Sequence, residues 1–283
     1  MEVNPMLWNN VTPEVRAHLV RLSRVVAGHG PMVVACSGGV DSGLLAYVAH
    51  RVLGGRMACV IGVSASLADG EEAGAVAFLE THRIPFARIN TRELDDARYR
   101  ANGPQRCYFC KRELFARIES APESKRFPVL AYGENADDRL DHRPGARAAE
   151  ERGVVAPLAE VGFTKELVRR AARELGLSLW DKPASPCLAS RIPYHSEVTP
   201  EKLRQVDEAE TALKRRGFVV CRVRHHGDTA RVEVPLEDHA RLREHRTWLD
   251  VQAEIRAAGF AHVEIVEDGF RSGRLNEALR PSP

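Results

Sequence analysis

The chain has 283 residues, of which 41 are Lys or Arg and 39 are Asp or Glu, for a net charge of +2. This balance argues against a globally basic nucleic-acid-binding surface, and no apolar run approaches the roughly 20 residues that span a bilayer. The first residues have neither the basic region nor the apolar region of a signal peptide. We therefore expect a cytoplasmic protein that binds neither membranes nor nucleic acid.

The first 180 residues alternate apolar strand-like runs with helical patterns. Strands are predicted in the run that ends at Cys36 and over 57–64, 85–90 and 128–133. Helices are predicted over Pro13–Ala27, Asp41–Leu53, Glu71–Thr81, Lys111–Glu119 and Thr164–Leu175. This alternation predicts an α/β fold built on a doubly wound parallel sheet, whose ligands bind beyond the carboxyl ends of the strands.

A proline-rich stretch between Trp180 and Pro200 interrupts the alternation. We expect the domain boundary there, with domains over 1–180 and 181–283. Beyond it, helices are predicted over Pro200–Arg216, Leu236–Glu244 and Val251–Ala258, and strands over 218–224, 230–234 and 262–267. This mixture predicts a smaller C-terminal α+β domain.

The run SGGVDS, residues 37–42, follows the first apolar strand and precedes a helix. A small-residue turn at a helix N-terminus offers free N–H groups and a favourable dipole to an anion. The sequence has neither the ending of a Walker loop nor the G-x-G-x-x-G of dinucleotide folds. SGGVDS resembles the PP-loop of the ATP pyrophosphatase family, which implies a PP-loop (HUP-like) fold and cleavage of ATP between the α- and β-phosphates.

Eight residues are predicted to bind the nucleotide: Ser37, Gly38, Gly39, Val40, Asp41, Ser42, Glu134 and Asp138. Asp41 is the candidate ligand of Mg²⁺, which offsets phosphate charge in the transition state; the alternative is an ordinary acid at a helix start. The run 157–177 resembles a second motif of this family, in which a Lys early in a helix reaches the phosphates. Lys165 fits that position, and its alternative is a plain surface Lys.

Six cysteines in a reducing compartment indicate metal or reactive chemistry rather than disulfides. Cys107 and Cys110 form a C-x-x-C pair, and Cys187 lies in the proline-rich stretch. Redox, zinc and iron–sulfur chemistry all fit a C-x-x-C, but structural zinc sites usually have four ligands. Three thiolates on a cubane cluster leave one iron without a protein ligand. The remaining cysteines, Cys36, Cys59 and Cys221, are expected to be buried thiols.

Three segments, 106–115, 133–158 and 183–210, resemble the LarE family of ATP-dependent sulfur transferases. That family makes thiocarboxylates during assembly of the nickel-pincer nucleotide cofactor. One form of the family gives up the sulfur of a single cysteine, and another has three cysteines that hold a 4Fe–4S cluster. The trio Cys107, Cys110 and Cys187 resembles the second form, and the resemblance places Cys187 at the sulfur-donating position.

The resemblance implies that ATP adenylates a carboxylate of a pyridinium-3,5-biscarboxylate mononucleotide, and that a sulfur nucleophile then displaces AMP. An anionic acceptor needs cations, and the candidates are Arg191, Arg222, Arg224 and Arg271. The resemblance puts Arg222 and Arg224 at the substrate phosphate. Glu210 and Glu233 match acidic family positions near the reactive cysteine and are candidate metal ligands. A homo-oligomer is expected.

Three other functions are weighed at this stage. A PP-loop enzyme of tRNA thiolation also adenylates its substrate and also uses cysteines, but it predicts an RNA-binding domain or strong positive charge. A metal or cluster carrier without enzymatic activity explains the cysteines but leaves SGGVDS without a role. Amide-forming synthetases with a PP-loop have no need of the cysteine trio.

Overall fold

A computed structural model of the chain describes residues 5–140, 144–271 and 273–277. The chain divides into two compact units. Unit 1 comprises residues 1–64, 70–93 and 107–185, and unit 2 comprises residues 65–69, 94–106 and 186–283. Two short segments from the first half of the chain thus group with the C-terminal residues, and the expected domain boundary at residue 180 stays a prediction.

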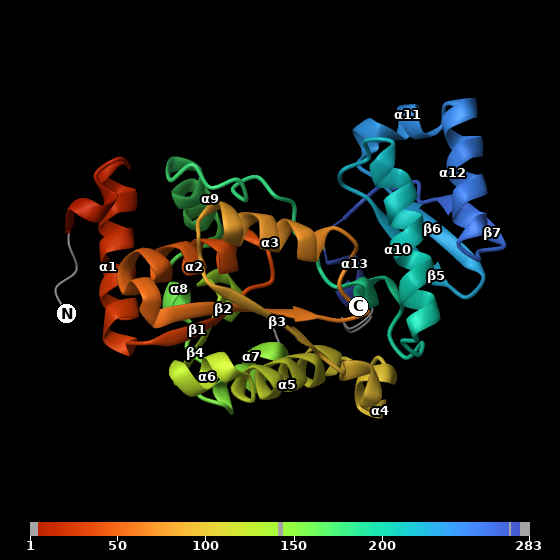
Figure 1. The fold of residues 1–283 in the computed structure, drawn as a ribbon. Helices are drawn as coiled ribbons and strands as arrows, with labels where there is room; N and C mark the ends of the chain where they lie inside the picture. The colour runs from red at the N-terminus through yellow and green to blue at the C-terminus, as the bar shows by residue number, and fades with distance from the viewer. Residues whose placement is uncertain (1–4, 141–143, 272, 278–283) are drawn as a thin grey trace. The chain divides into compact units, whose positions relative to one another are not determined.

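Unit 1 is built on a four-stranded parallel sheet (Figure 1). Its strands are β1 (Met32–Ala35), β2 (Met57–Val63), β3 (Phe86–Asn90) and β4 (Val129–Tyr132), in the order β3-β2-β1-β4. Its helices are α1 (Pro13–His29), α2 (Val40–Leu53), α3 (Glu71–Thr81), α5 (Arg106–Glu119), α6 (Pro122–Arg126), α7 (Pro144–Glu150), α8 (Pro157–Glu160) and α9 (Lys165–Glu174). The parallel pairing confirms the predicted doubly wound α/β fold.

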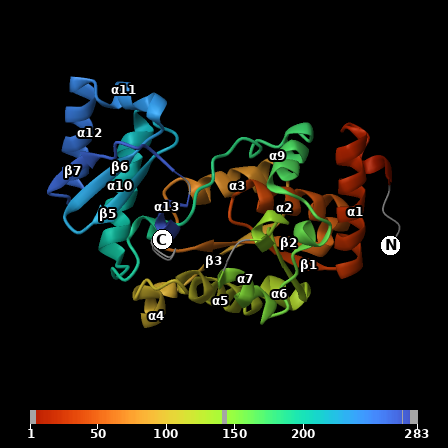
Figure 2. The ribbon, with the colours of Figure 1, turned by 180° about the vertical axis from the view of Figure 1, so that it is seen from behind.

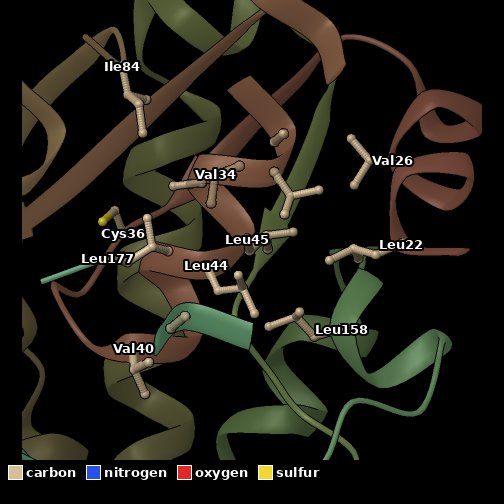
Figure 3. Packing of buried hydrophobic residues seen from close by; sticks show 14 of the residues in the cluster. Leu22, Val26, Val34, Cys36, Val40, Leu44, Leu45, Ile84, Leu158 and Leu177 are labelled. Carbon is tan, nitrogen blue, oxygen red and sulfur yellow. The ribbon is translucent and has the colours of Figure 1, made fainter. Parts of the chain in front are cut away.

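Both faces of this sheet are covered by helices, as a parallel sheet requires. Val34 and Cys59 belong to a core that includes residues of α1, α2, α8 and α9 (Figure 3). Val33 and Val60 belong to a second core, formed with residues of α5 and α7. Figure 2 shows the two helix layers from the opposite side. Successive residues of a strand point to opposite faces, and helices cover both faces here. All four residues of β1 are therefore buried.

The carboxyl ends of β1 and β4 approach each other closely, because these strands are neighbours in parallel register. Gly133 follows β4 and packs against the first turn of α2. A Cβ atom on Gly133 would stand 2.6 Å from the backbone nitrogen of Ser42. Only glycine permits this approach of two backbones.

Unit 2 contains a three-stranded sheet with helices packed on it. Its strands are β5 (Arg222–His226), β6 (Thr229–Glu233) and β7 (His262–Ile265); β5 pairs antiparallel with β6, and β6 pairs parallel with β7. Its helices are α4 (Ala97–Arg100), α10 (Pro200–Arg215), α11 (His239–Leu242), α12 (His245–Ala257) and α13 (Arg274–Glu277). Leu213 of α10 and Ile255 of α12 join Val223 and Val232 in its core. In the described part of the chain, no helix has the length and apolar character that crossing a membrane requires.

Two predicted elements of unit 2 differ from the structure. The strand expected over 218–224 begins only at Arg222. Phe218 and Cys221 are buried while Val219 is 67% exposed, so the buried positions are three residues apart instead of two. The helix expected over Leu236–Glu244 is a short 3₁₀ turn followed by α11.

We predict that Gly133→Ala destabilises the fold, because the new methyl group meets backbone atoms that cannot rotate away. The free energy of unfolding should fall by about 1–3 kcal/mol, the usual cost of overpacking. Urea unfolding followed by circular dichroism measures it. Gly28→Ala in α1 is the matched control, since a Cβ there has no neighbour within 4 Å and helix propensity should raise stability by about 1 kcal/mol. Equal stabilities of the two variants would contradict the close approach at Gly133.

Candidate functional site

The SGGVDS loop lies between the carboxyl end of β1 and the start of α2. Gly39 is the N-cap of α2. It has no side chain that could accept a hydrogen bond from the first N–H groups of the helix. The Ser42 hydroxyl accepts the Ser37 N–H at 3.2 Å and donates to the Gly39 carbonyl at 3.1 Å. Gly38 has a φ of +72°, which favours glycine. The loop is therefore a tight turn with backbone N–H groups at a helix N-terminus, the geometry that binds anions.

Asp41 and Lys165, predicted separately for the phosphate site, lie in contact although 124 residues separate them. The Lys165 Nζ donates to Asp41 Oδ2, and the Asn135 side-chain amide donates to Asp41 Oδ1 at 3.1 Å. Lys165 is the first residue of α9, whose N-cap Thr164 accepts the Leu167 N–H. The fold thus brings a carboxylate, an ammonium and an amide together beside the loop.

The GENADD run forms a turn that supports this cluster. The side-chain oxygen of Asn135 accepts hydrogen bonds from the N–H groups of Asp137 at 3.0 Å and Asp138 at 3.2 Å. Asp137 Oδ2 accepts the N–H of Lys165 at 2.7 Å, and Asp138 Oδ2 accepts the N–H of Asn135 at 3.3 Å. Glu134 is buried. The predicted nucleotide-binding role of Glu134 and Asp138 stays a prediction.

Sequence reasoning missed Asn135 and Asp137, which hold Asp41 and Lys165 in place. An Asn shortly after a strand and two residues before an acidic pair is a common start of a turn closed by its own side chain, and this was a usable signal. It also missed Lys182, whose Nζ donates to the Gly38 carbonyl at 3.0 Å and pairs with Glu71 at 2.8 Å. Lys182 lies in an irregular stretch, where no periodicity points to it.

Cys107 and Cys110 lie within a helix, which corrects the expectation that the helix begins at Lys111. α5 begins at Arg106, so both cysteines are in its first turns, three residues apart and on one side. Cys107 is exposed and Cys110 half-buried.

Cys187 lies in unit 2, where it precedes the short 3₁₀ helix Leu188–Arg191. It is half-buried. Cys107 and Cys110 belong to unit 1. Among the described residues, no three His, Cys, Asp or Glu side chains are gathered as metal ligands, and a cluster shared by the three cysteines stays a prediction.

The other three cysteines, Cys36, Cys59 and Cys221, are buried, as expected. A hydrogen bond with Cys59 is the main cause that lowers the pKa of Cys36 to about 7, against its burial. Burial raises the pKa of Cys221 to about 12, so this thiol is inert at neutral pH.

The candidate metal ligands of unit 2 are both paired with arginines. Glu210 forms an ion pair with Arg191 at 2.7 Å, and their side chains are 0% and 1% exposed, respectively. Glu233 forms two ion pairs, one between Oε2 and Arg224 at 3.0 Å and one between Oε1 and Arg274 at 3.0 Å.

The predicted substrate arginines lie in different surroundings. Arg222 is buried on β5, and its guanidinium lies 5.4 Å from the centre of the Phe270 ring. Burial lowers the pKa of Arg222, and the nearby charge of Arg191 acts in the same direction. Arg224, two residues along β5, lies on the same face. Arg271 is 52% exposed and pairs with Asp268. Its predicted substrate role stays a prediction.

No protein-family model matches the chain. An uncharacterized protein of Synechocystis sp. is 40% identical over 87% of this chain and 92% of its own length. The pyridinium-3,5-bisthiocarboxylic acid mononucleotide synthase of Lactiplantibacillus plantarum is 34% identical over 88% of this chain and 90% of its own length. One of the subunits of the glutamine-hydrolyzing GMP synthase of Pyrococcus furiosus is 25% identical over 73% of this chain and 70% of its own length.

The similarity to the bisthiocarboxylic acid synthase covers most of both proteins. The GMP synthase relative fits the PP-loop α/β fold of unit 1. This chain belongs to the LarE family of ATP-dependent sulfur transferases.

Proposed function

We propose that this chain adenylates a carboxylate of pyridinium-3,5-biscarboxylic acid mononucleotide and converts it into a thiocarboxylate for the nickel-pincer nucleotide cofactor. The observation that carries the proposal is the contact of Asp41 with Lys165 beside the SGGVDS loop, in a chain 34% identical to a synthase named for the bisthiocarboxylic acid product. Adenylation is needed because a carboxylate is a poor electrophile, and AMP is a good leaving group.

The loop binds the pyrophosphate end of ATP through its backbone N–H groups and the hydroxyls of Ser37 and Ser42. Lys165 exchanges Asp41 for the phosphates when ATP binds, since its side chain is 38% exposed and an exposed ion pair is weak. The freed Asp41 carboxylate is an oxygen ligand of the kind that Mg²⁺ prefers. Mg²⁺ bound there would offset the phosphate charge that builds up during transfer.

We predict that purified protein converts ATP into AMP and pyrophosphate when the acceptor is present, and that Asp41→Asn lowers this rate by about 100-fold or more, a loss typical of one charged group in phosphate chemistry. Coupled assays for AMP and pyrophosphate measure it. Glu208→Gln is a control, because Glu208 makes an exposed pair with Arg204 on α10 of unit 2. ADP as the main product would rule out α–β cleavage.

Arg222 and Arg224 hold the anionic groups of the acceptor. Burial is the main cause that lowers the pKa of Arg222, and the positive charges of Arg191 and, to a smaller degree, Arg224 act in the same direction. An anionic ligand offsets these charges, and arginine forks suit phosphate and carboxylate.

Arg222→Ala should weaken binding of the mononucleotide by roughly 10- to 150-fold, which corresponds to about 1.5–3 kcal/mol for one charged hydrogen bond. ATP affinity should change by less than about twofold, since the nucleotide loop lies in unit 1. Arg231→Ala is the matched control, because Arg231 lies on the adjacent strand β6 and pairs with Glu264 at the surface. Isothermal titration measures both ligands, and equal losses for both would overturn the assignment.

Cys107, Cys110 and Cys187 deliver the sulfur. Two thiols on one side of the first turns of α5 provide two of the three thiolates that a cubane cluster of this kind needs. Such a 4Fe–4S cluster, when bound, would supply an iron without a protein ligand that can carry a transferable sulfide. Cys187 provides the third thiolate in this proposal.

Each of Cys107→Ala, Cys110→Ala and Cys187→Ala should lower the iron content of anaerobically prepared protein and abolish thiocarboxylate formation, while pyrophosphate is still released from ATP, because adenylation precedes the attack of sulfur. Iron and sulfide assays with mass spectrometry of the product test this. Cys221→Ala is the control, since that thiol is buried in the core of unit 2. A loss of mass of about one H₂S at Cys187, with full activity in Cys107→Ala, would instead identify a sacrificial cysteine.

A further inference from the structure

The segment around Cys187 is irregular, yet its backbone carbonyls are held by buried arginines. Arg191 Nη1 donates to the carbonyls of Pro186 and Cys187 and to the Ser190 hydroxyl at 2.9 Å. Arg106 Nη1 donates to the Ala189 carbonyl at 2.8 Å. Carbonyls that would otherwise need water or a helix are thus satisfied inside unit 2.

The opposite edge of the Arg191 guanidinium is anchored on Glu210. Nε and Nη2 donate to the two carboxylate oxygens at 2.7 and 2.9 Å, a bidentate pair. Glu210 Oε1 also accepts the N–H of Val223 at 3.1 Å. The backbone at Cys187 is therefore connected through one guanidinium to α10 and to β5.

Burial decides what Arg191 can do. At 1% exposure, its guanidinium has almost no surface to offer a substrate. A fully buried ion pair contributes little net stability, because desolvation of the charges offsets their attraction. What the pair supplies is a fixed direction for the groups that it joins. This favours a structural connection to Cys187 over the substrate contact expected from the sequence.

We propose that Arg191 is a positioning residue for sulfur transfer: held by Glu210, it fixes the backbone of Pro186 and Cys187 so that the Cys187 thiol is presented in one place. The proposal rests on the proposed role of Cys187 in sulfur delivery. The amide of Leu188, which donates to the Ser66 carbonyl at 2.9 Å, anchors the segment on its other side.

Arg191→Lys tests this with the charge conserved. An ammonium keeps a partner for Glu210, but a single point donor cannot bridge the carboxylate and the carbonyls as the fork does. Arg204→Lys is the matched control, because Arg204 makes an exposed pair with Glu208 on α10, the helix that carries Glu210. In the full-length protein without iron, alkylation of Cys187 by iodoacetamide is followed by mass spectrometry, with the exposed Cys107 as internal reference.

We expect Arg191→Lys to speed alkylation of Cys187 relative to Cys107 by about tenfold, as local opening becomes easier. In the iron-loaded protein, the thiocarboxylate formed per pyrophosphate released should fall by about tenfold or more, since small misplacements of a reacting group are costly. Values equal to those of Arg204→Lys in either measurement overturn the proposal. A lower product ratio with unchanged alkylation would point to substrate contact instead, which also overturns it.

Hydrogen exchange in the wild-type protein provides a test that does not depend on folding of a variant. The N–H groups of Leu188 and Ser190 should exchange about 100-fold or more slowly than in an unstructured peptide, because the segment is held on both sides. Exchange at the unstructured rate overturns the proposal. If the wild-type protein forms AMP but no thiocarboxylate, the proposed function fails, while alkylation and exchange still decide whether Arg191 positions Cys187.

Discussion

The parallel pairing of β1 with β4 is the constraint on which the nucleotide site of unit 1 depends. It brings the SGGVDS loop beside the GENADD turn, and Gly133 permits the two backbones to approach. Asp41 then lies within reach of Asn135, and through it of the start of α9 with Lys165. Without β4 in this position, the ammonium and the carboxylate would have no common anchor.

The ion pairs of the two units differ in how readily they can be exchanged. Lys165 and Lys182 of unit 1 are partly exposed, with side chains 38% and 22% accessible, and their partners Asp41 and Glu71 are 16% and 18% accessible. Arg191 and Glu210 of unit 2 are completely buried, and removing one partner from such a pair costs about 3–5 kcal/mol. The exposed pairs suit binding, and the buried pair suits positioning.

The six cysteines likewise fall into a buried group and an accessible group. Cys36, Cys59 and Cys221 lie in the cores of the two units and are inaccessible to substrates. Cys107, Cys110 and Cys187 are exposed or half-buried. The first two lie on one side of the first turns of α5; the backbone carbonyl of the third accepts a hydrogen bond from the Arg191 guanidinium.

The sequence by itself determined the α/β class, the position of the SGGVDS loop between a strand and a helix, and which three cysteines are buried, because these depend on local pattern. A strand followed by SGGVDS and a helix is specified within a dozen residues, and burial of Cys59 follows from the apolar run around it. The start of α5 at Arg106 and the late start of β5 were missed, because packing overrides local propensity there. Only the tertiary structure decided the roles open to Asn135, Lys182 and Arg191. Their partners lie 94, 144 and 19 residues away, and no local pattern carries information about a contact across that separation. Whether an arginine faces a substrate or a buried carboxylate depends on which elements enclose it, and enclosure is a property of the folded chain.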